Sequence, residues 1–167
     1  MSKSASNAFS VQRVSWHVRR DDLVYVRRRV FIDEQGVPEE LEWDAEDENA
    51  DHVLAITSDG KPVGTGRLKR DCYVGRMAVL EPWRGRGVGG SILEKLLAIA
   101  RERGCTAVRL HAQTHALGFY ARFGFVPEGE EFEEAGIPHY LMKLRLPHRA
   151  QAVFCVAGAV NRNRSCD

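Results

Sequence analysis

The feature that most constrains this chain is a glycine-rich segment, Arg84-Gly85-Arg86-Gly87-Val88-Gly89-Gly90, between a strand-like apolar run and a helix-like run. Glycines at a strand-to-helix turn allow backbone N–H groups to close around an anionic oxygen, and the positive end of the helix dipole strengthens the attraction. The two arginines add positive charge. We therefore expect a ligand that carries phosphate groups to bind at this turn.

The turn alone does not identify that ligand. Gly85, Gly87 and Gly90 also satisfy the dinucleotide-binding pattern GxGxxG. A Rossmann turn follows its strand directly, however, whereas residues 81–84 intervene here, and no acidic residue ends the next strand at 107–111. The lysine of a phosphate-binding P-loop is absent. A tight turn without a ligand is a further interpretation, which the arginines make less attractive.

The rest of the pattern predicts one domain of strands and helices. Residues 11–18 alternate like a strand, and Asp21–Asp22 could cap a helix that runs to Phe31. Strand-like runs follow at 52–57, 61–69 and 73–80, and polar turns between them indicate an antiparallel meander. The expected order of elements is β, α, βββ, α, β, α, ββ, with a strand at 107–111, a short helix at 116–123 and strands near 125–126 and 139–146.

The helix after the glycines has the clearest periodicity. Its apolar residues fall on one face at helical spacing, and Arg101, Arg103 and Gly104 provide a stop signal. We expect this face to be buried; it consists of Val88, Ile92, Leu93, Leu96, Leu97, Ile99 and Ala100.

Composition excludes several classes of protein. With 167 residues, of which 44% are apolar, the chain can bury a core without metals or disulfides. A net charge of +1 argues against a general nucleic-acid or membrane-surface binder, and no apolar run reaches the roughly 20 residues of a membrane span. The N-terminal segment lacks the apolar core of a secretory signal, so we expect a cytoplasmic protein. The four cysteines show no CxxC pairing, and we expect no disulfide framework.

Two segments together resemble a known superfamily. MAVLEPWRGRGVGGSILE, followed about 25 residues later by ALGFYARFGF, is similar to the GNAT (GCN5-related) N-acetyltransferases over about residues 12–146. Their motif R-x-x-G-x-G is met by Arg84, Gly87 and Gly89. The segments RRRVFIDEQGVPEELEWDAEDENADH, GRLKRDCYVGRMAV, HAQTHALGFY and GIPHYLMKL resemble the ElaA-like branch of that superfamily.

The resemblance implies an α/β (α+β) fold with a mixed, mostly antiparallel sheet of about seven strands flanked by helices. It divides the chain into an N-terminal extension (1–11), an acetyltransferase domain (12–146) and a C-terminal tail (147–167). It also implies acetyl-CoA as co-substrate, with pyrophosphate on the glycine turn and pantetheine along the preceding strand. The implied cofactor-binding residues are Met77, Ala78, Val79, Arg84, Gly85, Arg86, Gly87, Val88, Gly89, Gly90 and Gln113.

Acetyl transfer requires a neutral amine, an oxyanion donor and a proton for the departing thiolate. A backbone N–H near Val79 could stabilise the oxyanion. The resemblance assigns the general acid to Tyr120, and a phenol of ordinary pKa keeps its proton at neutral pH. Tyr120 could instead simply pack its helix. Many relatives have an asparagine seven residues before the tyrosine, where this chain has Gln113, so cofactor contact there is plausible.

Three residues are candidates for the general base or the acceptor site, and each has a structural alternative. Glu34 could form a salt bridge at a helix end, His111 could be a satisfied core residue, and His139 could fix the last strand. His111 and His115 have the i,i+4 spacing of a zinc pair, but they straddle a strand end and no third ligand is apparent, so we expect no metal.

Charge patterning bears on the acceptor. Residues 39–48 contain seven acidic residues and residues 128–134 contain five, which would suit a cationic amine; two solvated acidic loops would explain them equally well. The sequence does not name the amine. A catalytically inactive acyl-CoA sensor is the alternative function. Dimers are usual among such proteins, so a homodimer is an expected state that the residues do not decide.

Overall fold

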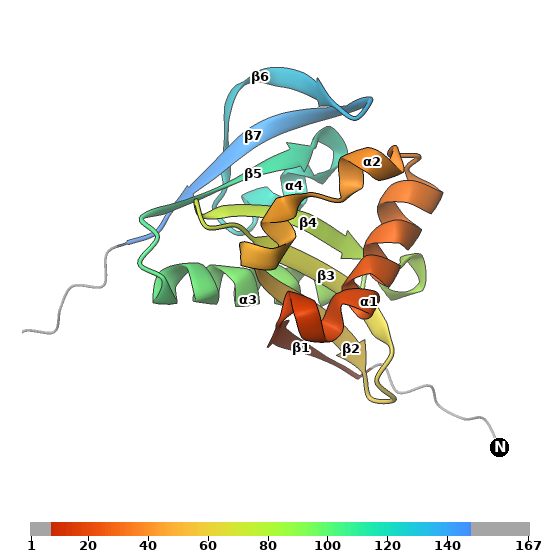
Figure 1. Cartoon of the computed structure of the whole chain (residues 1–167). Helices are drawn as coiled ribbons and strands as arrows, with labels where there is room; N and C mark the ends of the chain where they lie inside the picture. Colours follow the sequence, from red (N-terminus) through yellow and green to blue (C-terminus); the bar gives the residue numbers. More distant parts are fainter. Residues whose placement is uncertain (1–7, 148–167) are drawn as a thin grey trace, which may run out of the picture.

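The computed structural model describes residues 8–147, which form seven strands in one sheet with helices on its faces (Figure 1). The sheet order is β1-β2-β3-β4-β5-β7-β6, and all neighbours are antiparallel except β4 and β5. The strands are β1 (Phe9–Val14), β2 (Asp51–Thr57), β3 (Pro62–Leu68), β4 (Tyr73–Val79), β5 (Ala107–Gln113), β6 (Val126–Glu134) and β7 (Ile137–Arg145). The mostly antiparallel sheet confirms the expected fold class and is incompatible with a Rossmann domain.

Helical segments connect these strands. The α-helices are α1 (Trp16–Arg27), α2 (Glu39–Glu42), α3 (Val88–Glu102) and α4 (Leu117–Ala121). The π-helical segment η1 (Arg28–Glu34) continues α1, and short 3₁₀ segments are η2 (Ala45–Asn49), η3 (Glu81–Trp83) and η4 (Thr114–Ala116).

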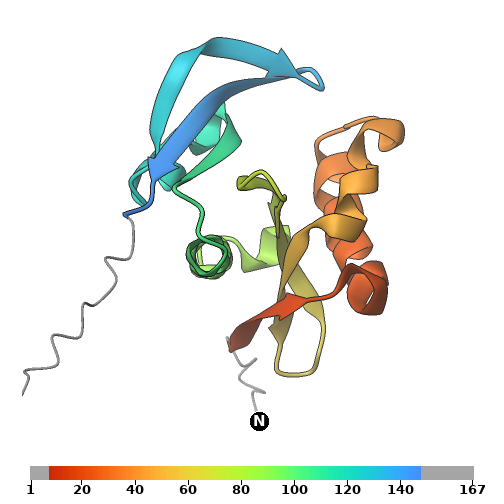
Figure 2. The same ribbon diagram turned by 60° about the vertical axis from the view of Figure 1, so that its left-hand side comes forward.

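Helices α1 and α3 cover opposite faces of the sheet, as Figure 2 shows with α3 seen end-on. The buried residues of α3 are the seven that its periodicity predicts, and they pack on the central strands in the main core. Removing such a continuous apolar face from water stabilises the fold by about 25 cal/mol per Å² of apolar surface. This core fixes β4 and the start of α3 relative to each other.

The start of α1 differs from the prediction. β1 ends at Val14 and α1 begins at Trp16, so residues 15–18 are not strand and the helix starts well before Asp21–Asp22. The Trp16 ring stacks on His52 of β2 with centroids 5.1 Å apart. This tertiary contact explains the error, because apolar alternation up to Val18 is compatible locally with either structure.

The acidic segment 39–48 is partly buried. Glu42 and Asp47 are each only 2% exposed, and both accept from Arg27, which is itself fully buried. The Arg27 guanidinium also lies 5.0 Å from the Trp43 ring centroid. A solvated loop is therefore the wrong interpretation for these two acids, because they pair with distant arginines that compensate their loss of water.

Cys72 and Cys105 form a disulfide, with Cα atoms 6.1 Å apart. This one bond runs against the expectation of no disulfide framework. Each cysteine lies just before a strand, β4 or β5, and the parallel pairing of these strands brings their beginnings together. The sequence separation of 33 residues has no local signature, so cysteine spacing could not reveal the pair.

Two further findings concern the described part of the chain. None of its helices is long and apolar enough to cross a membrane. No three His, Cys, Asp or Glu side chains within residues 8–147 are grouped so that they could hold a metal ion. Residues 148–167 of the C-terminal tail, with Cys155 and Cys166, lie outside the described residues.

Candidate active site

The site begins where β4 and β5 separate. These parallel strands pair only at Tyr73–Arg109 and Val74–Leu110, although β4 continues to Val79. The Leu80 N–H donates to Val63 of β3, so by strand alternation the N–H of Val79 points to the opposite side, toward the gap. The gap therefore offers to an extended ligand backbone groups of β4, such as the Val79 N–H, that pair with no other strand within residues 8–147.

A β-bulge shapes the same stretch of β4. Between the pairs Arg67–Gly75 and Thr65–Ala78, two residues of β4 oppose one of β3. Arg76 within this bulge has φ +51°, an uncommon value for a residue with a side chain. The bulge breaks the usual alternation, and all of residues 73–79 line one cavity.

The glycine turn leads from η3 into α3. Gly87 is the N-cap of α3 with φ +82°, and Gly85 has φ +72°, so both adopt conformations that favour glycine. A Cβ at either residue would meet nothing within 4 Å. The first amides of α3 have no intrahelical acceptor and thus form a suitable anion site. At Gly89 and Gly90 a Cβ would be in ordinary contact with Phe119 and Phe123.

The arginines of this turn have partners within the protein. Arg84 donates from Nε to the carbonyl oxygen of Val79 at 3.0 Å, and its two Nη atoms lie 2.7 and 2.8 Å from the carboxylate oxygens of Glu34. This pairing lowers the pKa of Glu34. The geometry thus favours the salt-bridge alternative for Glu34 over the role of a base. Arg86 stacks over the Trp83 ring, 5.0 Å from its centroid.

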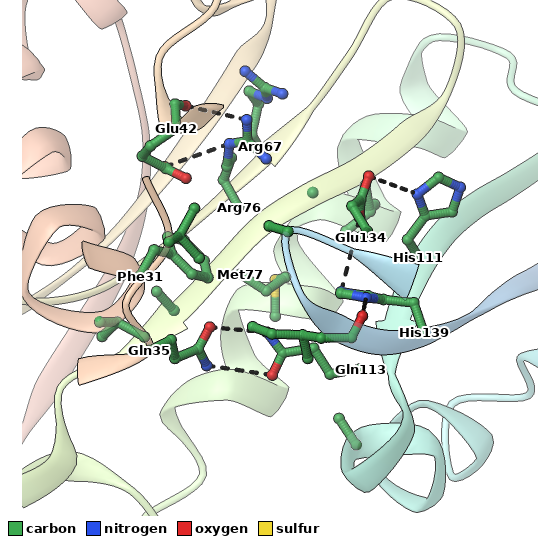
Figure 3. Close-up of a pocket in the computed structure, with 18 of the residues that line it drawn as sticks. Phe31, Gln35, Glu42, Arg67, Arg76, Met77, His111, Gln113, Glu134 and His139 are labelled. Carbon is green, nitrogen blue, oxygen red and sulfur yellow. Dashed lines mark hydrogen bonds and ion pairs between the residues drawn. The ribbon is translucent and has the colours of Figure 1, made fainter. Parts of the chain in front are cut away.

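A cavity of about 1110 Å³ opens beside the bulge (Figure 3). Its lining comes from η1 and α2 on one side, β4 in the middle, and β5, α4 and β7 on the other. It includes Met77, Ala78, Val79 and Arg84 but not residues 85–90, so the glycine turn lies outside it. The predicted cofactor residues therefore form two adjoining parts, a strand edge inside the cavity and a helix N-terminus beyond it.

Tyr120 lies at the wall of this cavity and is 8% exposed. Its ring packs against Phe119 and Phe125. Burial raises the pKa of Tyr120 to about 12. Within the described residues the hydroxyl makes no hydrogen bond, which leaves it able to donate to a ligand.

Gln113 pairs with Gln35, a residue that the sequence analysis did not single out. Gln113 Nε2 donates to Gln35 Oε1 at 2.9 Å, and Gln35 Nε2 lies 3.3 Å from Gln113 Oε1. Figure 3 shows this amide pair between η1 and β5 at one end of the cavity. Contact of Gln113 with a cofactor stays a prediction, and it would compete with this pair.

His111 and His139 lie on neighbouring strands and share one carboxylate, that of Glu134 (Figure 3). His111 Nδ1 is 3.3 Å from Glu134 Oε1, and His139 Nε2 is 3.8 Å from Oε2. His139 Nδ1 lies 2.7 Å from the Ile137 carbonyl oxygen, which only accepts. Nδ1 therefore carries the proton, and the unprotonated Nε2 of neutral His139 can accept one.

The sequence did not indicate Gln35 and Glu134 as members of the site. Glu134 belonged to the acidic segment 128–134, and only the pairing of β6 and β7 brings it to the histidines. His115 lines the cavity from η4, but it joins no group with three metal-binding side chains within residues 8–147.

Comparison with known proteins identifies the family of this chain. The family model described as "Acetyltransferase (GNAT) domain" matches residues 9–146. The chain is 41% identical over 125 residues to the Bacillus subtilis protein named "Uncharacterized N-acetyltransferase YjcF", which covers 72% of this chain and 89% of the relative. The crystal structure of Escherichia coli ElaA has a TM-score of 0.73 at 30% identity, covering 81% of this chain and 99% of ElaA.

A further solved structure shares the fold alone. A GNAT family acetyltransferase from Elizabethkingia anophelis with acetyl-CoA bound has a TM-score of 0.61 at 17% identity, covering 83% of this chain and 98% of that one. On the family match, this chain belongs to the GNAT acetyltransferase family and is an acyltransferase. The similarity to ElaA, at 35% identity over 130 residues, assigns it to the ElaA-like branch.

Proposed function

We propose that this protein transfers an acetyl group from acetyl-CoA to a primary amine by direct attack on the thioester. One observation carries the proposal: the separation of β4 from β5 leaves the strand edge at Met77–Val79 open inside a cavity that also contains Tyr120 and His139. The helix N-terminus at Gly87 adjoins this edge and suits a pyrophosphate. The acetyl-CoA bound to the Elizabethkingia relative supports the choice of co-substrate.

Each residue has a distinct role in this reaction. His139 Nε2 takes a proton from the amine, directly or through a water, as the amine nitrogen bonds to the thioester carbon. The Val79 N–H stabilises the oxyanion that forms on the carbonyl oxygen. Tyr120 gives its proton to the sulfur as the C–S bond breaks; His139 then releases its proton to solvent and Tyr120 regains one from solvent. Free coenzyme A and the acetylated amine are the products.

The decisive experiment has two readouts on the full-length protein. Calorimetry with acetyl-CoA tests binding, and release of free thiol with a panel of amines tests transfer. We expect both binding and amine-dependent thiol release. Binding without release for any amine would support an acyl-CoA sensor instead, and absence of binding would remove the proposal altogether.

A further inference from the structure

The charged residues that line the cavity differ in how well they are paired. Arg84 binds Glu34 at 2.7 Å, Arg67 binds Asp44 at 2.7 Å, and Lys69 binds Glu46 at 2.9 Å. Ion pairs this short satisfy both partners. Arg76, Glu134 and the exposed Asp71 are different, because their ion-pair contacts are all 3.3 Å or longer.

Arg76 shares carboxylates that other arginines already hold. Its Nε lies 3.4 Å from Glu42 and its Nη2 lies 3.4 Å from Asp44, whereas Glu42 is 2.6 Å from Arg27 and Asp44 is 2.7 Å from Arg67. The buried Nε forms no hydrogen bond within residues 8–147, and neither does Nη1. Burial and the neighbouring arginines lower the pKa of Arg76. A further anion would relieve this unfavourable environment.

Arg76 and Glu134 lie on opposite sides of the cavity. Figure 3 shows Arg76 beside Glu42 on the α2 side and Glu134 with the two histidines on the β5–β7 side. The cavity thus presents a guanidinium on one side and, on the other, a carboxylate beside the basic nitrogen of His139. This arrangement is complementary to a molecule that has an acidic group at one end and an amine at the other.

The anion at Arg76 has to come from the acceptor rather than from the cofactor. In the proposed function the pyrophosphate lies on the amides of residues 85–90, beyond the end of β4, and those residues do not line the cavity. Arg76 lies inside β4, at the bulge, and points toward α2.

We propose that the acceptor is a small amine that also carries a carboxylate, an amino-acid type of molecule, with its carboxylate bound by Arg76 and its amine directed to His139 and Glu134. This inference rests on the proposed function. Arg76 acts as a specificity residue, because its Nη1 can donate a charge-assisted hydrogen bond to a carboxylate while Nη2 stays on the carbonyl oxygens of Leu41 and Glu42, and the thioester chemistry is unchanged.

The test compares free amino acids, including those with a terminal amine, with their carboxamides in the thiol-release assay. Because a carboxamide lowers the pKa of a nearby amine, kcat/KM is expressed per concentration of neutral amine. We expect the wild-type protein to prefer at least one acid over its amide by about tenfold or more. Arg76→Gln should lower kcat/KM for that acid far more than for the amide, and Arg76→Lys should restore part of the preference.

Arg70→Gln is the matched control. Arg70 is exposed, donates to the Asn49 carbonyl oxygen at 2.7 Å and lies outside the cavity, so the same change of charge there should leave the preference intact. Calorimetry with acetyl-CoA verifies that each variant is folded and binds the co-substrate.

Several outcomes would overturn the inference. If carboxamides or simple alkylamines are acetylated as efficiently as the acids, the inference is wrong, although N-acetyltransferase activity is established. An Arg76→Gln variant that keeps the preference for acids, or one whose main defect is weaker binding of acetyl-CoA, would also overturn it. If no amine of any kind supports thiol release, both the proposed function and this inference are removed.

Discussion

Tyr120→Phe separates a proton donor from a packing residue. The substitution keeps the ring contacts with Phe119 and Phe125 and removes a hydroxyl that has no hydrogen-bond partner within residues 8–147. The free energy of unfolding should therefore change by less than about 1 kcal/mol. If Tyr120 protonates the thiolate, turnover should fall about 10²-fold, which corresponds to about 2.7 kcal/mol of transition-state stabilisation.

The raised pKa of Tyr120 sets the expected pH profile. With a pKa of about 12, the phenol is ionised to only about one part in a thousand at pH 9, so the wild-type rate should not fall through ionisation of Tyr120 in the usual assay range. Tyr120→Phe should accordingly lower the rate over the whole range without changing the shape of the profile.

Single-turnover kinetics with saturating acetyl-CoA would measure the chemical step. Tyr140→Phe is the matched control, because Tyr140 lies on β7 but does not line the cavity, and it should retain full turnover. Full turnover of Tyr120→Phe would show that the tyrosine is structural. An alkaline decrease near pH 10 that only the wild type displays would contradict the effect of burial on its pKa.

Three other predictions test the turn, the disulfide and a buried histidine. Gly89→Asp should abolish acetyl-CoA binding in calorimetry, because it adds a negative charge at the helix N-terminus where the phosphate would bind. Gly89→Ala, whose Cβ would lie an ordinary 3.5 Å from Phe119, should lose much less affinity for acetyl-CoA. Equal losses of affinity would refute the phosphate site. Cys72→Ser should lower the free energy of unfolding by roughly 4 kcal/mol, because the unfolded chain loses a cross-link between residues 33 apart in sequence. Denaturation with and without reductant measures this change. Alkylation of Cys72 without reductant would contradict the bond. Burial lowers the pKa of His52, so below about pH 6.5 the unfolded chain takes a proton that the folded state resists, and the free energy of unfolding should fall between about pH 7 and 5. His52→Gln should make the free energy of unfolding depend less steeply on pH in this range. An unchanged pH dependence would refute the attribution to His52.

The parts of the fold that the sequence predicts well are those with local causes. Helix α3 follows from a 3.6-residue periodicity with a glycine turn before it and a stop signal after it, and the meander β2–β4 follows from apolar runs between polar turns. The predicted beginning of α1 was wrong, because its position depends on the stacking of Trp16 on His52, a residue far from it in the sequence.

The site residues that a motif marks were the most directly predictable, whereas His111 and His139 were candidates without a motif. Arg84 and Tyr120 belong to recognisable segments, and both line the cavity. Gln35 and Glu134 take their places through pairing with Gln113 and the histidines across the sheet, which no local pattern records. Charge patterning indicated acidic segments but not their partners, because ion pairs such as Arg67–Asp44 join residues far apart in sequence.

The bulge in β4 links the two halves of the cavity. In a regular strand successive side chains alternate between faces, and the bulge at Arg76 and Met77 interrupts that alternation. The extra residue lies opposite Gly66, where a Cβ would come within 2.7 Å of Ile92 and Leu96. Packing of α3 against a glycine thus coincides with the bulge, and the bulge both turns Arg76 toward α2 and lies where β4 leaves β5. The exposed strand edge and the cation proposed to select the acceptor therefore lie at one local irregularity, which packs against the core of α3.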